Sequence, residues 1–323
     1  MTSRRWLGWL LLFPPTALAA QQEAEPERPY PRLVTAATRA EPATLARLER
    51  PGTVLCVDEF ESNDSFAAWF EVTGTEQGHA AIDREQAHGG KSSLRLRAPD
   101  NGGKSSGASA VRWLGDAGHD CLHIRYWIRY APDYDQGNLN HTGGALSGVA
   151  GNFKWAGMGG AGQRPTGLDH FSTRVEGWRD WGRTAAPGWL FCYAYWMDMK
   201  RDRDGNYWGN MMGPGEAERF VPPRGQWSCV EQRVAVNQPG HADGELAVWL
   251  DGKLYLHYTG FRWRGSDEVR LKRASLMVYV HAAQRDNTVW YDDFVVSTGY
   301  IGMGAVKAPD DKAPPATEPA RKL

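Results

Sequence analysis

Apolar and polar residues alternate along most of the chain in short runs, which Gly, Asn, Asp and Pro separate. Period-two alternation predicts β-strands, and no stretch shows a sustained helical period. The predicted strands are Val54–Phe60, Ser92–Arg97, Leu122–Tyr130, Phe171–Trp178, Leu190–Met197, Ser228–Val236, Glu245–Leu250, Lys253–Tyr258, Ala274–His281 and Val289–Ser297. Many strands without helices predict an all-β sandwich or barrel.

One connection carries a strong hairpin signal. Asp251-Gly252 stands between two strand-like runs, and this dipeptide favours the tight turns that join antiparallel strands. We therefore expect these two runs to pair directly.

The alternation also predicts which side chains share a face of the sheet. Tyr193 and Tyr195 lie two residues apart, so they project side by side. Arg174, Glu176 and Trp178 form a similar polar and aromatic face on the preceding run. A strand with such a face is partly exposed to water and could line a groove.

The ends of the chain differ in composition from its middle. Residues 1–20 have a basic start, an apolar run and a small-residue end, which predict a signal peptide and export to the periplasm or medium; an uncleaved anchor is the alternative. Residues 21–52 are rich in Pro, Glu, Ala and Arg, a composition that indicates a linker with at most a short helix near residues 43–48. Residues 53–303 form one domain, and 304–323 predict a disordered tail.

Charge and aromatic content indicate which classes of molecule the protein is expected to bind. With 37 basic and 38 acidic residues, no overall field attracts nucleic acid or an anionic membrane. Fifteen tryptophans exceed what a core of this size needs, although burial is the commoner explanation for any single ring. Aromatic rings can stack on the apolar faces of sugars. We therefore expect no nucleic-acid partner, no membrane contact after signal cleavage, and a monomer.

The four cysteines are widely spaced and match no C-x-x-C metal motif. In an oxidising compartment they predict two disulfides. Three pairings are possible, and we favour Cys56 with Cys121 and Cys192 with Cys229.

Four segments of the chain form a set: Lys154 to Gly160, Phe171 to Arg174, Tyr193 to Tyr195, and Trp290 to Phe294. In order, they are similar to a Lys-Leu-Pro-Gly-Leu-Gly-Gly segment, a Phe-Ser-x-Arg strand, a Tyr-x-Tyr strand and a closing aromatic-Asp-Asp-Phe strand. Through these segments the chain from Lys154 to Ile301 resembles the family 14 polysaccharide lyases, which are jelly-roll enzymes that cleave alginate or glucuronan. The resemblance implies a concanavalin A-like β-jelly-roll sandwich and a lyase activity on an acidic polysaccharide.

A second register is also open. It places Gly143 to Gly148 on the family's glycine-rich segment and puts Ala145 where the lysine belongs. That register would predict an inactive protein. We prefer the first, because it keeps both the lysine and the glycines that follow it.

The resemblance implies a β-elimination in which a tyrosine acts as base and acid and a lysine neutralises the substrate carboxylate. Residues matching these roles are Lys154, Tyr193 and Tyr195. As substrate-binding residues we expect Arg174, Trp178, Gln163 and His170, since an arginine fork binds carboxylates at two points. His141 and His170 are alternative bases.

No cofactor is required for this chemistry, although Asp292 and Asp293, with Asp58 or Glu61, could hold a structural calcium. A non-catalytic carbohydrate-binding protein on the same fold is the main rival. A jelly-roll glycoside hydrolase ranks last, because no strand carries the expected carboxylate pattern. Protease and nucleotide-binding motifs are absent from the sequence.

Overall fold

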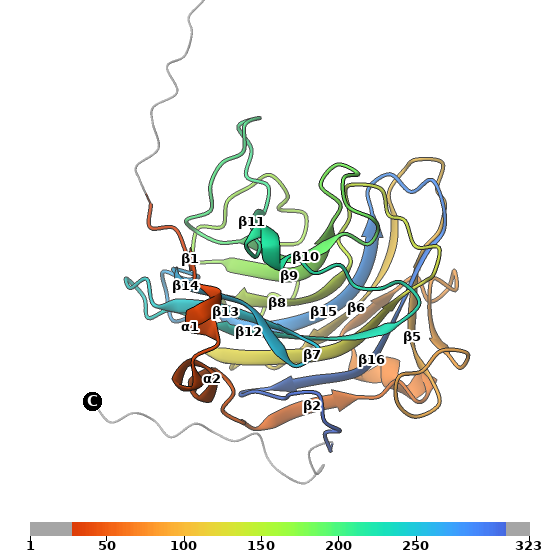
Figure 1. Cartoon of the computed structure of the whole chain (residues 1–323), viewed down its shortest axis with the longest axis horizontal. Helices are drawn as coiled ribbons and strands as arrows, with labels where there is room; N and C mark the ends of the chain where they lie inside the picture. Colours follow the sequence, from red (N-terminus) through yellow and green to blue (C-terminus); the bar gives the residue numbers. More distant parts are fainter. Residues whose placement is uncertain (1–27, 308–323) are drawn as a thin grey trace, which may run out of the picture.

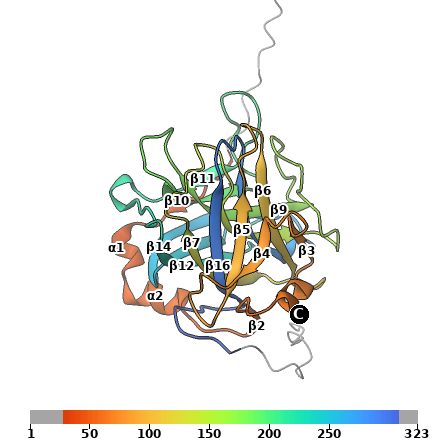
Figure 2. The ribbon, with the colours of Figure 1, turned by 90° about the vertical axis from the view of Figure 1, so that its right-hand side faces the viewer.

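Two antiparallel sheets pack face to face in the computed structural model, which describes residues 28–307 (Figure 1). Figure 2 shows the edge at which β16, β5 and β4 lie side by side. The predicted all-β jelly-roll sandwich of the concanavalin A-like type is confirmed.

The first sheet has nine strands. In spatial order they are β1 (Arg32–Leu33), β14 (Lys253–Phe261), β13 (Gly244–Leu250), β12 (Trp227–Ala235), β7 (Cys121–Tyr130), β16 (Asn287–Ser297), β5 (Ser93–Ala98) and β4 (Ala80–Asp83), with β2 (Val54–Asp58) paired to β16.

The second sheet has seven strands. Their spatial order is β11 (Asn210–Met212), β10 (Trp189–Tyr195), β9 (His170–Trp178), β8 (Gly143–Val149), β15 (Arg270–Val280), β6 (Ser106–Trp113) and β3 (Glu71–Thr73). Short helical segments complete the described chain: α1 (Ala36–Arg39), α2 (Pro42–Leu48) and two 3-10 turns, η1 (Asn63–Ala68) and η2 (Glu216–Glu218).

Each of the ten predicted strands is present, with ends shifted by a few residues. The predicted hairpin is also present, because Leu250 pairs with Lys253, and Asp251 and Gly252 both have positive φ. This conformation is that of a tight two-residue turn.

The core lies between the two sheets and takes one side chain in two from each strand, as alternation requires. Cys192, Ala194 and Trp196 are fully buried there, whereas Tyr193 and Tyr195 lie on the opposite face of the same strand. The predicted division of the β10 side chains between two faces is confirmed.

The predicted disulfides are wrong for the described structure, in which all four cysteines are free. In each favoured pair one thiol lies in the core and the other lies on the outer face of the nine-stranded sheet. Cys56 and Cys192 belong to the core cluster. Cys121 and Cys229 alternate with core residues on β7 and β12, so they point away from it.

The expected linker is partly structured instead. Its β1 pairs with β14, and the expected short helix is present as α2. Leu48 at the end of α2 is 2% exposed and packs against Trp249 on the outer face of the sheet. These contacts make residues 32–48 part of the domain.

Of the expected tail, residues 304–307 are described; Arg125 donates a hydrogen bond to the carbonyl oxygen of Gly304. The expected signal peptide and the rest of the expected tail lie outside the described residues. No helix within residues 28–307 is long and apolar enough to cross a membrane.

Candidate active site

The outer face of the seven-stranded sheet presents two rows of side chains that cross five strands. Register pairs one row as Tyr193, Arg174, Ala145, Ser275 and Val111, from β10 through β9, β8 and β15 to β6. The neighbouring row is Tyr195, Ser172, Ser147, Arg273 and Trp113. Directly opposed side chains lie close enough to act on one ligand.

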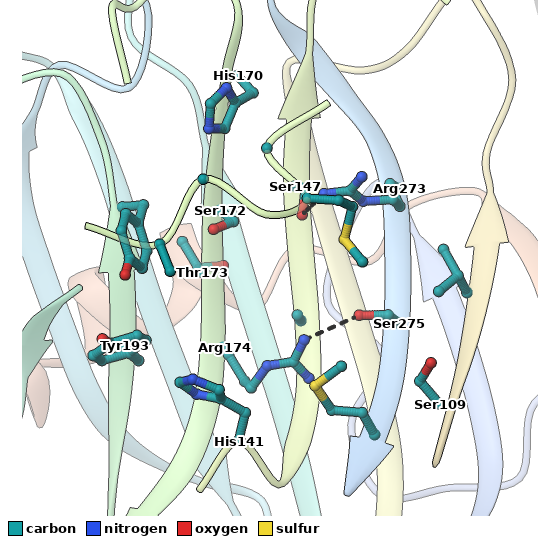
Figure 3. Close-up of a pocket in the computed structure, with 18 of the residues that line it drawn as sticks. Ser109, His141, Ser147, His170, Ser172, Thr173, Arg174, Tyr193, Arg273 and Ser275 are labelled. Atoms are coloured by element: carbon teal, nitrogen blue, oxygen red, sulfur yellow. Dashed lines mark hydrogen bonds between the residues drawn. The ribbon is translucent and has the colours of Figure 1, made fainter. Parts of the chain in front are cut away.

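A pocket of about 260 Å³ opens over these rows (Figure 3). The glycine-rich loop at residues 157–161 forms one side of it, and His141 and His170 approach from two ends. Among the described residues that line the pocket, two are arginines and none is a carboxylate. The pocket is therefore suited to an anionic ligand.

Arg174 reaches over the small side chain of Ala145. One guanidinium nitrogen donates to the carbonyl oxygen of Gly143 at 2.8 Å, and another lies 3.4 Å from Ser275 Oγ. Arg273 enters from β15, on the other side of β8, and donates to Ser147 Oγ at 3.3 Å. Both guanidinium groups therefore lie on the pocket floor, Arg174 toward Ser275 and Arg273 beside Ser147 (Figure 3).

The two arginines repel each other. Burial, followed by the nearby charge of Arg174, lowers the pKa of Arg273 to about 10. A bound carboxylate would relieve this repulsion, because an opposite charge at short range favours the charged form of both groups.

Tyr193 and Tyr195 form the wall beside Arg174, with ring centroids 5.6 Å apart. The Gly209 N–H donates a hydrogen bond to the Tyr193 hydroxyl at 2.8 Å. Burial, and then the neighbouring Tyr195, raise the pKa of Tyr193 well above its usual value. Tyr193 therefore retains its proton and suits the role of a proton donor.

The two histidines each lie near a carboxylate. His170 Nδ1 is 3.4 Å from Asp169 Oδ2, and burial lowers the pKa of this imidazole. His141 Nδ1 is 3.0 Å from Glu176 Oε2.

Lys154 does not join these residues. Its ammonium lies over the rings of Phe70 and Trp113, at 4.7 and 5.8 Å from their centroids. Its carbonyl oxygen accepts a hydrogen bond from Arg273, which ties the loop to the pocket floor. The structure therefore places Lys154, the residue expected to neutralise a substrate carboxylate, outside the pocket lining, with its ammonium over two aromatic rings.

Ala145 instead occupies the pocket wall, in register with Arg174 and Ser275. This is the position to which the second register assigned the family's lysine. Because Ala145 has only a methyl group as its side chain, the Arg174 side chain can pass over it.

Of the four residues expected to bind substrate, two line the pocket and two lie outside it. Arg174 and His170 line the pocket. Gln163 is exposed on the loop and lies outside the lining. Trp178 also lies outside it, at the end of β9, where its ring packs edge-on against Trp181 at 5.2 Å.

The carboxylates considered for calcium are engaged in other contacts. Asp58 accepts hydrogen bonds from the Phe60 N–H and from Trp69 Nε1, and Asp292 accepts one from the His88 N–H. Within residues 28–307 no group of three or more His, Cys, Asp or Glu could hold a metal ion.

The sequence did not single out Arg273, Ser275, Ser147 or Ser109. The predicted strand at 274–281 began one residue after Arg273, so the alternation that links Arg273 to Ser275 and Met277 was cut at its first member. Extending that alternation by one residue would have placed Arg273 on the pocket face.

Comparison with known proteins places this geometry in a family. Solved structures that share the fold include a mutant of alginate lyase Aly36B in complex with alginate tetrasaccharide, with a TM-score of 0.54 and 16% identity over 80% of this chain and 98% of that one. The PL-14 alginate lyase from Aplysia kurodai has a TM-score of 0.57 and 16% identity over 77% of this chain and 99% of its own. The endo-β-1,4-glucuronan lyase from the fungus Trichoderma reesei has a TM-score of 0.52 and 15% identity over 76% of this chain and 96% of its own. A search of curated proteins finds no match.

The sequence profile of polysaccharide lyase 14 matches residues 88–290, which is more than half of the chain and includes β5 to β15 with the whole pocket. The protein therefore belongs to polysaccharide lyase family 14.

Proposed function

We propose that this protein is an exported lyase that cleaves a uronic-acid-containing polysaccharide, of the alginate or glucuronan type, by β-elimination. One observation carries the proposal: Arg174 and Arg273 both line a pocket whose described lining holds no carboxylate. A uronate polymer supplies one carboxylate per sugar, which complements this charge. Export rests on the sequence of residues 1–20.

Charge neutralisation falls to the arginines. When the C5 proton leaves, negative charge builds on the adjacent carboxylate, and a guanidinium fork placed there stabilises it. Arg273 is 7% exposed and Arg174 is half-buried, so little water screens them. The proposed chemistry needs no cofactor, because these two side chains supply the positive charge.

The tyrosines supply the proton for the departing O4. The pKa of Tyr193 is raised by burial and by Tyr195, so its hydroxyl is protonated at neutral pH and can donate. Elimination needs no water nucleophile, which agrees with the absence of paired carboxylates among the described lining residues.

The test is the ultraviolet absorbance of the unsaturated product. Alginate, glucuronan and a neutral β-glucan are incubated separately with the wild-type protein. We expect absorbance to rise with at least one uronate polymer and not with the neutral one. No rise with any uronate polymer would refute the lyase proposal.

Variants sharpen this test. Arg273→Ala should lower kcat/KM by about 100-fold or more, as loss of one charge-stabilising donor does in other enzymes. Lys154→Ala is the matched control, since it removes a cation from the adjoining loop but outside the pocket. We expect it to stay within a few-fold of wild type.

A non-catalytic carbohydrate-binding protein is the second candidate. Ala145 in the pocket wall favours it, because the second register predicts an inactive protein. Binding of alginate or glucuronan in calorimetry, without any rise in absorbance, would support this candidate over the lyase.

A further inference from the structure

The pocket needs a group that accepts a proton as well as one that donates it. Tyr193 is suited to donate, since burial and Tyr195 keep its hydroxyl protonated. The arginines hold positive charge and cannot accept a proton. Among the described lining residues, the two imidazoles have the ordinary pKa nearest neutrality, so they are the strongest candidates for a base.

His141 is held rigidly at the pocket wall. Its N–H donates to the carbonyl oxygen of Tyr279 at 2.8 Å, and its own carbonyl oxygen accepts from the Tyr279 N–H at 3.0 Å. Its ring lies near the rings of Tyr193 and His281, with centroids 5.3 and 5.2 Å away. Figure 3 shows the imidazole between Tyr193 and Arg174.

Glu176 fixes the orientation of this imidazole. Its side chain is 4% exposed, and its carboxylate lies 3.0 Å from His141 Nδ1. A carboxylate at Nδ1 keeps the proton on that nitrogen and leaves the Nε2 lone pair free to act as a base. Burying a carboxylate is costly unless a partner compensates it, and the hydrogen bond with His141 does so for Glu176.

His170 lacks this arrangement. Its partner Asp169 is substantially exposed, with a side-chain exposure of 45%, and the contact is longer at 3.4 Å. Burial lowers the pKa of His170, and the charge of Arg273 acts in the same direction. An imidazole whose carboxylate partner is more distant and more exposed is the poorer base of the two.

We propose that His141, oriented by Glu176, is the base that removes the C5 proton during cleavage. The proposal rests on the lyase function proposed above. His141 Nε2 takes the proton from C5, and the C–H electron pair forms the C4–C5 double bond. The C4–O4 bond breaks, and the departing O4 takes the proton of a tyrosine hydroxyl. The imidazolium then releases its proton to solvent and the tyrosinate takes one from solvent, so both side chains return to their starting protonation states.

The test compares His141→Ala, Glu176→Gln and the control His241→Ala in steady-state assays with the uronate polymer that the wild type cleaves. His241 is exposed on a loop outside the pocket. His141→Ala should lower kcat by about 100-fold or more with KM within a few-fold, because general base catalysis is lost. Added imidazole should restore part of that activity. His241→Ala should match the wild type.

Glu176→Gln removes the negative charge of the carboxylate but keeps the size and shape of the side chain. The amide oxygen can still accept from Nδ1, but the negative charge that favours the imidazolium is gone. We expect a smaller loss of kcat and an acid limb of the kcat/KM profile that moves to lower pH. The groups facing the imidazole, namely Arg174, Tyr193, Tyr279 and His281, stay unchanged in this variant.

The outcomes distinguish the two proposals. Product from the wild type and from His141→Ala at equal kcat would overturn the role of His141 and leave the lyase function standing. A loss in His141→Ala that imidazole does not restore, with an unmoved acid limb in Glu176→Gln, would also overturn it. Absence of product with the wild type overturns both.

Discussion

Gly148 on β8 shows how single residues shape the pocket floor from behind. A Cβ added to this glycine would lie 2.0 Å from Phe171 Cε1, and one added to Gly144 would lie 2.2 Å from Tyr126 Cε1. Both glycines face the core, where an aromatic ring packs directly on the strand backbone. The alternate positions, Ala145 and Ser147, face the pocket and leave room for the arginines.

Gly148→Ala should lower the free energy of unfolding by about 1–3 kcal/mol, because the added methyl group overlaps a ring that has no space to move. Urea denaturation followed by tryptophan fluorescence measures the change. Gly215→Ala is the control, since its φ is negative and its nearest neighbour would lie at an ordinary 3.4 Å. Equal stability of the two variants would contradict the packing argument.

The alternation of side chains predicted the pocket positions of Tyr193, Tyr195 and Arg174 from the sequence. It did not determine where the loop lysine points, since Lys154 lies outside the strands and its direction depends on Phe70. Contacts between residues far apart in sequence are not encoded in local periodicity. The identity of the buried partner at His141 was hidden for the same reason.

Whole strands were missed where small residues weaken the pattern. β8 and β6 consist largely of Gly, Ala and Ser, so they present no strong apolar alternation. Glycine inside a strand often marks a close approach of another group, and that signal was present in β8. β8 and β6 both lie under the pocket, so its floor could not be assembled from the sequence.

The segment carrying α2 is joined to the sheet by an ionic cluster. Glu245 on β13 lies 2.9 Å from Arg47 of α2, 2.7 Å from Arg233 of β12 and 3.5 Å from His257 of β14. Burial alone would raise the pKa of Glu245. Hydrogen bonds from His257 and Arg47, with the charge of Arg233, outweigh burial and hold this pKa well below its usual range.

Glu245→Gln should therefore lower the free energy of unfolding at pH 7 by about 1–3 kcal/mol, the scale of hydrogen bonds to a charged group. The folded-state pKa lies below the unfolded value of about 4.3, so the stabilisation is present above that pH and is lost as pH falls toward the folded-state pKa. Denaturation series from pH 7 down to pH 3 should show the variant converging on wild type.

Glu76→Gln, on an exposed turn, is the control for that series. It should follow the wild type at every pH. A gap between Glu245→Gln and wild type that stays constant with pH would contradict the ionic interpretation and indicate packing instead.

At the scale of the whole molecule, the outer faces of the two sheets differ. The outer face of the nine-stranded sheet is covered near Trp249 by Leu48 and Tyr300, and Arg125 binds the carbonyl oxygens of Gly302 and Gly304. The outer face of the seven-stranded sheet carries the pocket instead. Chain segments thus cover part of one outer face, whereas the other is open at the pocket.

That open face extends beyond the pocket. Trp178 shares the β9 face of Arg174 and lies four residues further on, about 13 Å along the strand. The ring of Trp181 beside it is 65% exposed, with the backbone at a positive φ of 54°. An aromatic ring so exposed is suited to stack on a pyranose, and the separation from Arg174 is one that only an oligosaccharide could span.

Trp181→Ala should therefore raise KM for the polymer by about 5- to 10-fold, as loss of about 1 kcal/mol or slightly more of stacking does. It should leave kcat unchanged, since the ring lies outside the pocket. Steady-state assays on the polymer and on short uronate oligomers measure this. The shortest oligomers should show no difference, because they fill the pocket without reaching the ring.

The control Met303→Ala removes an exposed apolar side chain near the nine-stranded sheet and should alter neither KM nor kcat. An equal rise in KM for the shortest oligomers would place Trp181 inside the catalytic pocket and contradict a groove that continues along β9.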